Sequence, residues 1–485
     1  MTILDEKTWT SSIFSRGWTR SKAGDSAVVE PATGTELGRV GVGGAEDISL
    51  AAAAAAAAQP AWAATNFEER AAVLRRAGAL FEEHAAEIEQ WLVREAGSIP
   101  PKAATETHVA AQECYEAAAA ASRPQGEILA TALPRLSLAR RVPVGVVGVI
   151  APFNFPLILG IRSVAPALAL GNAVVFKPDS RTAVSGGVSI ARIFEEAGLP
   201  DGVLHVLPGG AEAGEALVTE PHVKVVSFTG STAVGRRVGE LAARYLKRTH
   251  LELGGNSALI ILDDVDIDRA VSAGAWGSFL HQGQICMTIG RHLVQQSVAA
   301  AYVEGLAAHA DALPVGDPFT AEVALGPLID AKARDKVDGM VKRTVDAGAR
   351  LAAGGRYEGL FYRPTVLADV APGMPAYTEE VFGPVAPVAT FSTPDEAVAL
   401  AAGTGYGLSL GILTRDLDRA LELAERIPTG IVHINDQTVN GEAVAPFGGV
   451  QDSGTGVRFG GDANLNAFTD TRWITMRGEP PPYPF

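Results

Sequence analysis

Cysteine is scarce in this chain: only Cys114 and Cys286 occur among 485 residues. Two cysteines build no disulfide framework, so buried apolar surface must hold the fold, and a reducing, cytoplasmic setting is expected. Cys114 lies in AAQECYEAAAA, a helical pattern in which a packed thiol is the simplest interpretation. Cys286 lies in FLHQGQICMTIGR, a segment too polar for an ordinary core strand, and is either a buried small side chain or a nucleophile.

Basic charge is also in deficit, with 40 Lys and Arg against 55 Asp and Glu and a net charge of −15. That balance argues against a nucleic-acid partner, which usually meets a basic surface. No run of 18 apolar residues is free of charged, polar or turn residues, so no membrane span is predicted. The first residues, MTILDEKTWTSSIFSRGW, lack the basic and then apolar regions of a secretory signal.

Several motifs are missing as well. The chain contains no GxxxxGK[ST], HExxH, CxxC or strict GxGxxG. Phosphate-binding loops and zinc proteases each depend on one of the first two motifs. No metal site is therefore expected, and any catalytic group must come from residues spread along the chain.

The sequence does show a change in its residue pattern along the chain. Residues 45–122 follow helical spacing, through the eight alanines of Ala51–Ala58 and an apolar series that Gly97 is expected to end. From Arg141 onward, short apolar strands alternate with helices. This alternation predicts parallel sheets covered on both faces, with ligands beyond the carboxyl ends of the strands.

The predicted fold class is therefore α/β, with two sheets that meet near Gly254 and Gly255. The first unit takes residues 1–121 and 146–254, and the second takes residues 255–463. The piece from Ser122 to Arg141 and the tail TRWITMRGEPPPYPF look hairpin-like or extended and fit neither unit, so the segments 122–145 and 464–485 are set apart from both.

Polar residues follow several of the predicted strands. Lys177 ends the strand NAVVFKP, where a lysine either binds ribose hydroxyls or is merely solvated. Asn154 lies between two prolines in APFNFP. It is either a plain turn residue or a rigidly held amide that stabilises an oxyanion.

Three further candidates come later in the chain. Gly230 and Ser231 in FTGSTAVG lie at a strand-to-helix turn, which is either plain turn chemistry or a phosphate site at a helix N-terminus. Glu252 lies between two leucines in LELGG and is either exposed or a desolvated carboxylate with the raised pKa of a general base. Glu380 precedes VFGP, a turn that could present its carboxylate to a ligand.

Taken in order, these motifs are specific. The series PFNFP, FKP, FTGS, LELGG, GQIC, EEVFGP and PFGG resembles the aldehyde dehydrogenase superfamily over nearly the whole chain. The stretches KPDSRTAVSGG and GIVHINDQTVNGEAVAPFGGVQDSGTG resemble its benzaldehyde and vanillin dehydrogenase branch. The resemblance implies a Rossmann-like doubly wound cofactor domain in the first unit, an α/β catalytic domain in the second, and a small β oligomerisation domain made of 122–145 and 464–485.

The resemblance also implies a mechanism for oxidising an aldehyde to its acid with NAD or NADP. Cys286, as a thiolate, would attack the aldehyde carbon to give a thiohemiacetal. The amide of Asn154 and the backbone N–H of Cys286 would hold the oxyanion. Loss of hydride to the nicotinamide would leave a thioester, and Glu252 would activate the water that hydrolyses it. The implied cofactor-binding residues are Lys177, Ser180, Gly230, Ser231, Glu380 and Phe382.

The choice between the two nucleotides stays open. Relatives that prefer NAD often read KPxE, and the glutamate binds the adenosine ribose. Here that position is Ser180, and Arg181 follows. A missing carboxylate removes repulsion against a 2′-phosphate, and a nearby arginine could attract one, so the sequence permits NADP as well as NAD.

By position in the family pattern, six residues should line the substrate pocket: Leu159, Arg162, Ile285, Met287, Val439 and Phe447. Mostly apolar walls suit an aromatic aldehyde of the benzaldehyde or vanillin type, or a medium-chain one. Arg162 either faces solvent or binds a polar ring substituent. The expected partners are the aldehyde and further copies of the chain in a homodimer or homotetramer, paired through the small β domain.

Other functions fit parts of the same sequence. A medium-chain aliphatic or semialdehyde dehydrogenase would use the same residues. A CoA-acylating dehydrogenase would release the thioester to a thiol and needs no water-activating base, so Glu252 argues against it. A non-enzymatic, structural use of the fold predicts a missing nucleophile or base, whereas both candidates are present.

Overall fold

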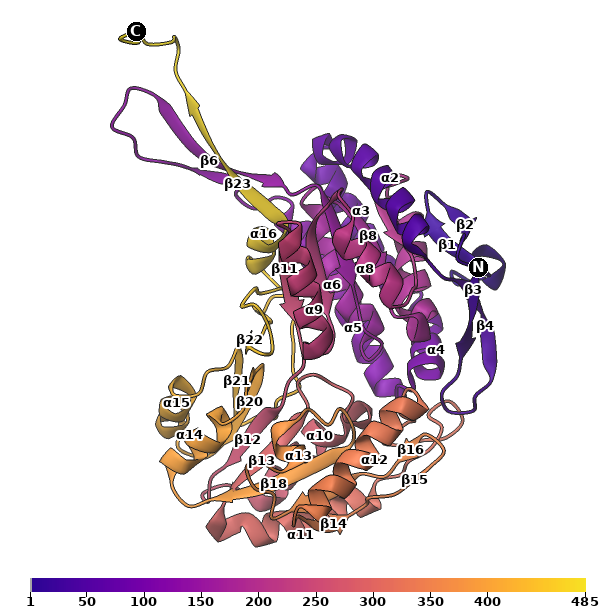
Figure 1. The fold of residues 1–485 in the computed structure, drawn as a ribbon, viewed down its shortest axis with the longest axis vertical. Helices are drawn as coiled ribbons and strands as arrows, with labels where there is room; N and C mark the ends of the chain where they lie inside the picture. The colour runs from indigo at the N-terminus through magenta and orange to yellow at the C-terminus, as the bar shows by residue number, and fades with distance from the viewer. Residues whose placement is uncertain (1) are drawn as a thin grey trace.

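Two seven-stranded sheets organise the protein, seen here in a computed structural model that describes residues 2–485. The first sheet lies in the upper half of Figure 1. It has the order β11-β10-β7-β8-β9-β1-β2, with β1 (Ser12–Ser15), β2 (Trp18–Arg20), β7 (Val146–Ile150), β8 (Ala173–Lys177), β9 (Leu204–Val206), β10 (Val223–Thr229) and β11 (Arg248–Glu252). Strands β7 to β11 pair in parallel, as predicted.

Helices cover both faces of the first sheet (Figure 1). They are α2 (Ala45–Ala64), α3 (Phe67–Glu83), α4 (Ala85–Ala96), α5 (Pro100–Ala120), α6 (Pro156–Ala169), α7 (Ser189–Glu196), α8 (Ala211–Thr219) and α9 (Thr232–Arg244). The helical pattern predicted for residues 45–122 is confirmed. Gly97 ends α4 in the left-handed conformation, with φ of +66°, which a residue without Cβ adopts at little cost.

The N-terminal residues form strands that sequence patterning did not anticipate. After the short helix α1 (Glu6–Trp9), strands β1 and β2 extend the first sheet in antiparallel fashion at its edge. Strands β3 (Asp25–Val29) and β4 (Glu36–Gly41) form a separate hairpin. These strands are short, and their buried face depends on the helices that pack against it, so no long alternating pattern marks them.

The second sheet has the order β14-β17-β18-β13-β12-β20-β21. Its strands are β12 (Ser257–Ile261), β13 (Ile289–Gln295), β14 (Arg350–Ala353), β17 (Thr365–Ala368), β18 (Val385–Phe391), β20 (Ser409–Leu413) and β21 (Ile431–Ile434). Its helices are α10 (Ile267–Phe279), α11 (Gln296–Ala312), α12 (Ala331–Asp346), α13 (Pro375–Thr378), α14 (Pro394–Ala402) and α15 (Leu417–Glu425). Two small strand pairs complete this half: β15 (Tyr357–Glu358) with β16 (Phe361–Tyr362), and β19 (Tyr406–Gly407) with β22 (Val450–Gln451).

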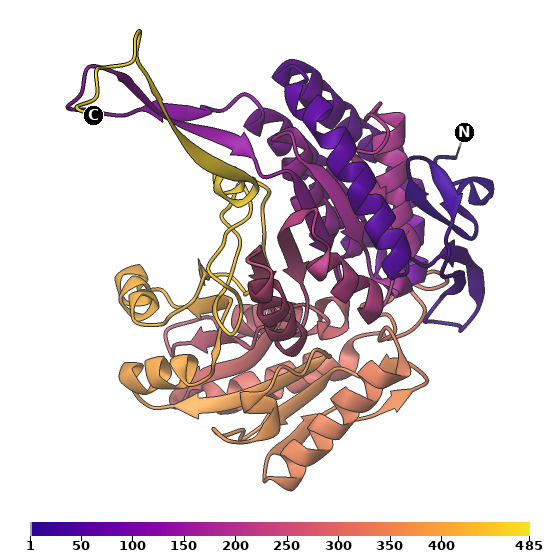
Figure 2. The same ribbon diagram turned by 45° about the horizontal axis from the view of Figure 1, so that its top comes forward.

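A third, three-stranded sheet projects from the body of the molecule as an arm (Figures 1 and 2). It consists of β5 (Gly126–Ile128), β6 (Leu136–Pro143) and β23 (Thr469–Met476), with β6 in the middle. The hairpin-like or extended form expected of residues 122–141 and of the tail from Thr471 agrees with β5, β6 and β23, and α16 (Ala463–Phe468) precedes that tail. The apolar side chains of Leu465 and Phe468 are buried there, so packing decides the helix.

The strand register brings the ends of the first sheet's strands to one edge. Ile150 pairs with Lys177 and with Phe228, and Thr229 pairs with Glu252. The carboxyl ends of β7, β8, β10 and β11 therefore meet at the edge that faces the second sheet, where side chains from four strands can act together.

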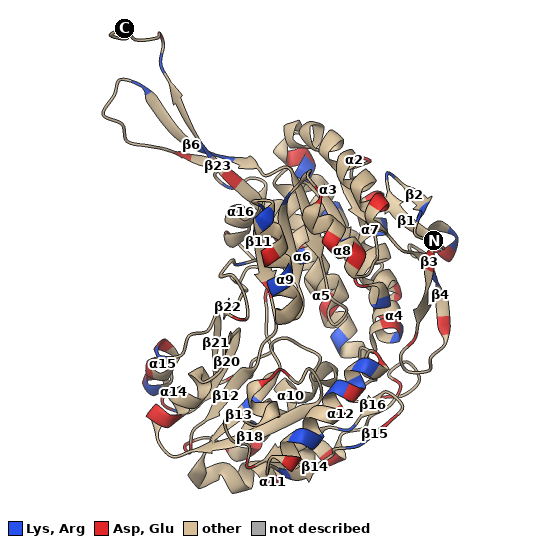
Figure 3. Cartoon of the chain, in the orientation of Figure 1, with Lys and Arg blue, Asp and Glu red and all other residues tan. Residues whose placement is uncertain are grey.

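Charge is distributed over the outside of the molecule. In Figure 3, basic and acidic segments are mixed along the outer helices, whereas the strands of the two large sheets are mostly uncharged. Across residues 2–485, every helix is too short or too polar to cross a bilayer.

Candidate active site

The predicted site residues converge between the two large sheets, although they come from six different elements. Four of them follow strands of the first sheet, and two precede strands of the second. These six are Asn154 after β7, Lys177 at the end of β8, Ser231 between β10 and α9, Glu252 at the end of β11, Cys286 before β13 and Glu380 before β18.

The loop that carries the cysteine has an unusual backbone. His281, Gln282 and Gly283 have φ values of +49°, +56° and +66°, and for an L-residue the left-handed region costs about 1–2 kcal/mol. Hydrogen bonds hold this conformation: the Gln282 side chain donates to the Gly97 carbonyl at 3.0 Å and the Pro327 carbonyl at 2.8 Å. Such overdetermined strain is typical of functional loops.

Cys286 as a whole residue is partly exposed, whereas its thiol is desolvated. Desolvation raises the pKa of its thiol to about 12, while Arg162 lowers it and the carboxylates of Glu380 and Glu252 raise it further. The thiol form is therefore favoured until a reacting partner or base draws off the proton. A burial cost that one cation offsets only in part keeps the proton on sulfur.

Asn154 is 3 % exposed, and its side-chain amide donates to the Gln284 carbonyl at 2.8 Å. Gln284 lies two residues before Cys286, so this bond places the amide beside the cysteine loop. An amide has two N–H donors, which leaves one for a ligand. The alternative of a plain, solvated turn asparagine does not fit this burial.

Glu252 is 2 % exposed, and neither of its carboxylate oxygens has a hydrogen-bond partner. Desolvation raises its pKa to about 8, although Arg162 and Arg458 lower it. The predicted rise in pKa is confirmed. Oε1 lies 2.9 Å from the point where a Cβ of Gly448 would stand, so a glycine leaves the space beside this base open.

Arg162 occupies the centre of the site. It is 5 % exposed, and its guanidinium carbon lies 4.5 Å from the ring centroid of Phe447 and 5.3 Å from that of Phe459. One terminal nitrogen donates to the Thr229 hydroxyl at 3.3 Å, and Nε is buried without a partner. The alternative that Arg162 faces solvent is wrong, because helix α6 and the two phenylalanines enclose it.

Sequence reasoning missed one carboxyl group in this region. Glu113 on α5 is buried, and desolvation raises its pKa to about 8, opposed by the nearby charge of Arg162. Helical spacing could have found it, because Glu106, Ala110, Glu113 and Ala117 share one face of α5 and all are buried.

The proposed nucleotide-binding residues form a surface that suits a dinucleotide. Ser231 is the N-cap of α9, and its side chain makes no capping bond, so its hydroxyl and the helix N-terminus can both serve a phosphate. Lys177 is buried and donates to the Gly209 and Pro178 carbonyls at 2.6 and 3.2 Å, which leaves one ammonium donor for a ribose hydroxyl.

Glu380 completes this surface from the second sheet. Its Oε1 accepts from the Gly255 backbone N–H at 3.0 Å, and desolvation raises its pKa to about 7. A Cβ on Gly254 would lie 2.6 Å from Oε2, so the glycine permits this close approach. An acceptor held in that way fits the second ribose of a dinucleotide.

The structure places Ser180 and Phe382 around Arg181. Ser180 begins the short helix η1 (Ser180–Thr182). Phe382 lies edge-on to Phe153 at 6.0 Å, and Phe153 stacks under the Arg181 guanidinium at 4.3 Å. Arg181 donates to both carboxylate oxygens of Asp179 at 2.9 Å and to Asp330 at 2.7 Å. Three of its five N–H groups thus donate to carboxylates, which weakens the attraction that it could exert on a 2′-phosphate.

The remaining pocket residues surround the cysteine from two sides. Ile285 and Met287 flank Cys286, and the Thr438 hydroxyl donates to the Met287 carbonyl, which brings Val439 beside that loop. Leu159 is buried in the core that also contains Phe459. Within residues 2–485, no group of three potential metal ligands comes together.

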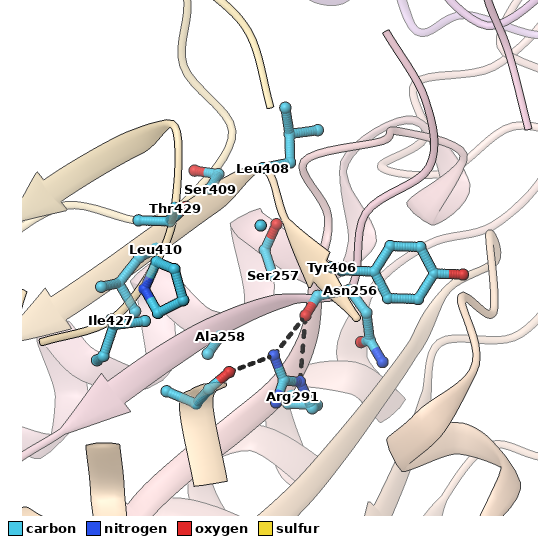
Figure 4. Close-up of a pocket in the computed structure, with 13 residues that line it drawn as sticks. Asn256, Ser257, Ala258, Arg291, Tyr406, Leu408, Ser409, Leu410, Ile427 and Thr429 are labelled. Carbon is cyan, nitrogen blue, oxygen red and sulfur yellow. Dashed lines mark hydrogen bonds between the residues drawn. The ribbon is translucent and has the colours of Figure 1, made fainter. Parts of the chain in front are cut away.

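A small cavity beside Asn256 does not suit an organic substrate. It is lined by Asn256, Ser257 and Arg291 among others, and its volume is about 20 Å³, which is room for about one water molecule. Figure 4 shows the Arg291 guanidinium directed at the Asn256 carbonyl, to which two of its nitrogens donate at 3.1 and 2.8 Å. This contact anchors the chain immediately after Gly255.

Comparison with known proteins gives consistent matches. Residues 18–474 match the model of the aldehyde dehydrogenase family. The chain is 68 % identical to a vanillin dehydrogenase from an Amycolatopsis species, over all of both chains. It is 50 % identical to the benzaldehyde dehydrogenase [NAD(+)] of Pseudomonas putida, over 99 % of each. A crystal structure of a salicylaldehyde dehydrogenase from Pseudomonas putida G7, complexed with salicylaldehyde, superposes with a TM-score of 0.94 at 35 % identity, covering 98 % of this chain and 99 % of that one.

Proposed function

Because the chain belongs to the aldehyde dehydrogenase family, we propose that it oxidises an aromatic aldehyde to the carboxylic acid with NAD or NADP. The observation that carries the proposal is the meeting of Cys286, Asn154 and Glu252 between the two sheets beside the apolar, arginine-containing pocket. The names of the relatives, vanillin and benzaldehyde dehydrogenases, support an aromatic substrate.

The chain's residues divide the reaction among them. As the sulfur of Cys286 bonds to the aldehyde carbon, its S–H becomes acidic and the carboxylate of Glu252, with a pKa of about 8, takes the proton. The free N–H of Asn154 stabilises the oxygen that becomes negative. When bound, the nicotinamide supplies the hydride acceptor. Glu252, after losing its proton, takes one from the water that hydrolyses the thioester on Cys286.

Arg162 selects the substrate in this proposal. A buried guanidinium with an unpartnered Nε and one hydrogen bond of 3.3 Å still needs acceptors. An oxygen substituent on an aromatic ring, such as a phenolic oxygen, is an acceptor that could enter the pocket with the ring against Phe447. Arg162 therefore favours hydroxylated aromatic aldehydes over aliphatic ones.

The nucleotide preference follows from Arg181. Because Asp179 and Asp330 already pair with this guanidinium, a 2′-phosphate would meet two carboxylates beside the cation. NAD is therefore the favoured nucleotide.

The arm of β5, β6 and β23 serves assembly. Its exposed apolar side chains include Ile128 at 78 % and Trp473 at 64 % exposure, and exposed edge strands are commonly covered by another subunit. We infer a homodimer or homotetramer paired through the arm. A nucleophilic thiol that must stay reduced suits the cytoplasm.

The test is the initial rate of nicotinamide reduction with benzaldehyde, vanillin and hexanal, each with NAD and with NADP, and with or without CoA. We expect the highest kcat/KM with the aromatic aldehydes and NAD, and free acid as product without CoA. Faster turnover of hexanal would overturn the aromatic assignment. A product that requires CoA would overturn hydrolysis by Glu252.

Cysteine variants provide the matched control. Cys286→Ala should abolish oxidation and leave nucleotide binding intact, whereas Cys114→Ala, which removes the packed thiol in α5, should keep activity within about twofold. Activity that survives Cys286→Ala would contradict the covalent mechanism.

A further inference from the structure

A buried ion pair on α5 has no part in the reaction described so far. Lys102 is 4 % exposed and Glu106 is 0 % exposed, and they lie one helical turn apart. Removing two charges from water is expensive, and a pair of this kind is often no more stabilising than apolar residues of the same size. Stability alone therefore does not explain this ion pair.

The pair is bonded to the backbone at Asn154 and at the start of the helix that follows it. The Lys102 ammonium lies 2.5 Å from the Glu106 carboxylate, donates to the Asn154 carbonyl at 2.9 Å, and lies 4.1 Å from the ring centroid of Phe155. The other carboxylate oxygen of Glu106 accepts from the backbone N–H groups of Leu157 at 2.9 Å and Ile158 at 3.3 Å.

These contacts replace an ordinary helix cap. Helix α6 begins at Pro156 without a side-chain capping bond from its own N-cap residue, Phe155. Glu106 instead satisfies two of the orphan N–H groups of the first turn, and its negative charge suits the positive end of the helix dipole. The backbone of Asn154 is thus fixed by Lys102 immediately before a helix end that is fixed by Glu106.

The same pair also faces the cysteine loop. The ring of His281 lies edge-on to Phe155 at 5.6 Å, and both of its nitrogens are buried without a hydrogen-bond partner. Burial lowers the pKa of His281 well below its usual value, and the charge of Lys102 lowers it further. Phe155 is thus in contact with both the Lys102 ammonium and His281 of the cysteine loop.

We propose that Lys102 and Glu106 are positioning residues that aim the Asn154 amide at the oxyanion. The proposal rests on the proposed function, because it assigns the pair to the step in which charge develops on the aldehyde oxygen. Displacing a catalytic group by about 1 Å can cost on the order of a hundredfold in rate. Removing one oxyanion donor costs roughly 10²–10³ in kcat.

The test combines variants of the pair with a variant of its target. Lys102→Met removes the ammonium and keeps the apolar stem, and Glu106→Gln keeps an acceptor and removes the charge. We expect each to slow the single-turnover burst of nicotinamide reduction about ten- to a hundredfold. KM for the aldehyde and Kd for NAD should change less than about threefold.

The decisive comparison is made in the Asn154→Ala protein. If the pair acts through the amide, Lys102→Met changes the burst rate by less than about twofold once the amide is gone, because coupled residues are not additive. An equal loss in both backgrounds would mean a merely structural role and would overturn the proposal, as would an unchanged burst rate in the otherwise wild-type protein.

Two controls keep the outcome interpretable. Thr107→Val alters a buried hydroxyl on α5 that bonds only within the helix, to the Ala103 carbonyl at 3.1 Å, and should leave the burst rate unchanged. If Lys102→Met does not fold, Glu106→Gln is measured in the same two backgrounds and decides the matter. Absence of any aldehyde oxidation by the wild-type protein would instead refute the proposed function.

Discussion

At the scale of single residues, burial gives this site its chemistry. Glu252, Glu113 and Cys286 are each held by desolvation at a pKa above their ordinary values, and Arg162 is the cation near all three. A carboxylate that keeps its proton until about pH 8 is a stronger base than an exposed one. The same burial means that charging it destabilises the folded protein.

Glu252 therefore links activity and stability to pH in opposite directions. Its folded pKa of about 8 lies above the ordinary glutamate value of 4.5, so the folded state binds more protons than the unfolded state between these values. Stability is lost as pH rises through that window, and the loss is complete above about pH 8. Turnover that depends on the carboxylate rises over the same range.

The prediction is that Glu252→Gln lowers kcat by roughly 10²–10⁴ while raising Tm at pH 9 by about 1–3 °C. At pH 5, where Glu252 is protonated in the folded protein, the two proteins should melt at about the same temperature. Thermal unfolding of both proteins at pH 5 and pH 9 makes the comparison. Equal Tm values at pH 9 would contradict a buried, costly carboxylate.

Arg162 carries a second prediction at this scale. Arg162→Met keeps the apolar stem over Phe447 and removes the donors, so kcat/KM for vanillin should fall about tenfold more than kcat/KM for benzaldehyde. Arg162→Lys keeps the charge near Cys286 without the planar fork. This variant should therefore retain more of the wild-type kcat than of the preference for vanillin over benzaldehyde. Equal losses for both aldehydes would show that Arg162 acts on the thiol alone.

At the scale of elements, the site depends on how closely two loops approach each other. The loop after β11 passes against the cysteine loop at Gly255, where a Cβ would lie 2.1 Å from the Cys286 carbonyl oxygen. Backbone cannot move aside as a flexible side chain can. The glycine therefore sets the distance between the base at the end of β11 and the nucleophile before β13.

Gly255→Ala tests this contact. We expect kcat/KM to fall at least tenfold, since the cysteine loop must shift by more than is compatible with catalysis. Gly456→Ala is the control for mutation of a glycine in a turn, because nothing lies within 4 Å of its added Cβ, although its own φ of +83° makes a modest loss of Tm expected. Unchanged activity of Gly255→Ala would show that the loop tolerates displacement.

The extent to which the sequence predicts the fold and the site differs from element to element. The parallel strands and the residues at their ends follow from local patterns, because strand, turn and helix signals lie within a few residues of Asn154, Lys177 and Glu252. The helix α16 could not be predicted in that way, because Leu465 and Phe468 form it by packing against distant segments. The roles proposed for Lys102 and Glu106 depend on distant contacts. Lys102 bonds to the Asn154 carbonyl, which is 52 residues away, and no local sequence pattern reveals such a contact.

At the scale of the whole molecule, the arm is the feature that a single chain leaves unexplained. Its central strand is paired on both sides, but Ile128, Trp473 and Met476 expose apolar side chains at 78, 64 and 48 %. Burial in an interface would remove this surface from water at roughly 25 cal/mol per Å².

The prediction is that Ile128→Asp together with Trp473→Lys shifts the protein to a smaller species. Light scattering coupled to gel filtration measures the mass, and NAD binding reports whether the subunit stays folded. Leu246→Asp serves as the control, since Leu246 is 95 % exposed on another surface, in the turn after α9. A double variant with the wild-type mass would place the interface elsewhere.

The arm also affects how the protein folds during its synthesis on the ribosome. Ser137 in β6 and Trp473 in β23 are joined by a hydrogen bond across 336 residues of sequence, and translation at roughly 5–20 residues per second separates their appearance by tens of seconds. Throughout that interval β6 has an open edge that the same chain cannot yet close. A nascent subunit is therefore most exposed to mispairing with its neighbours on a polysome through the strand that its own β23 will later cover.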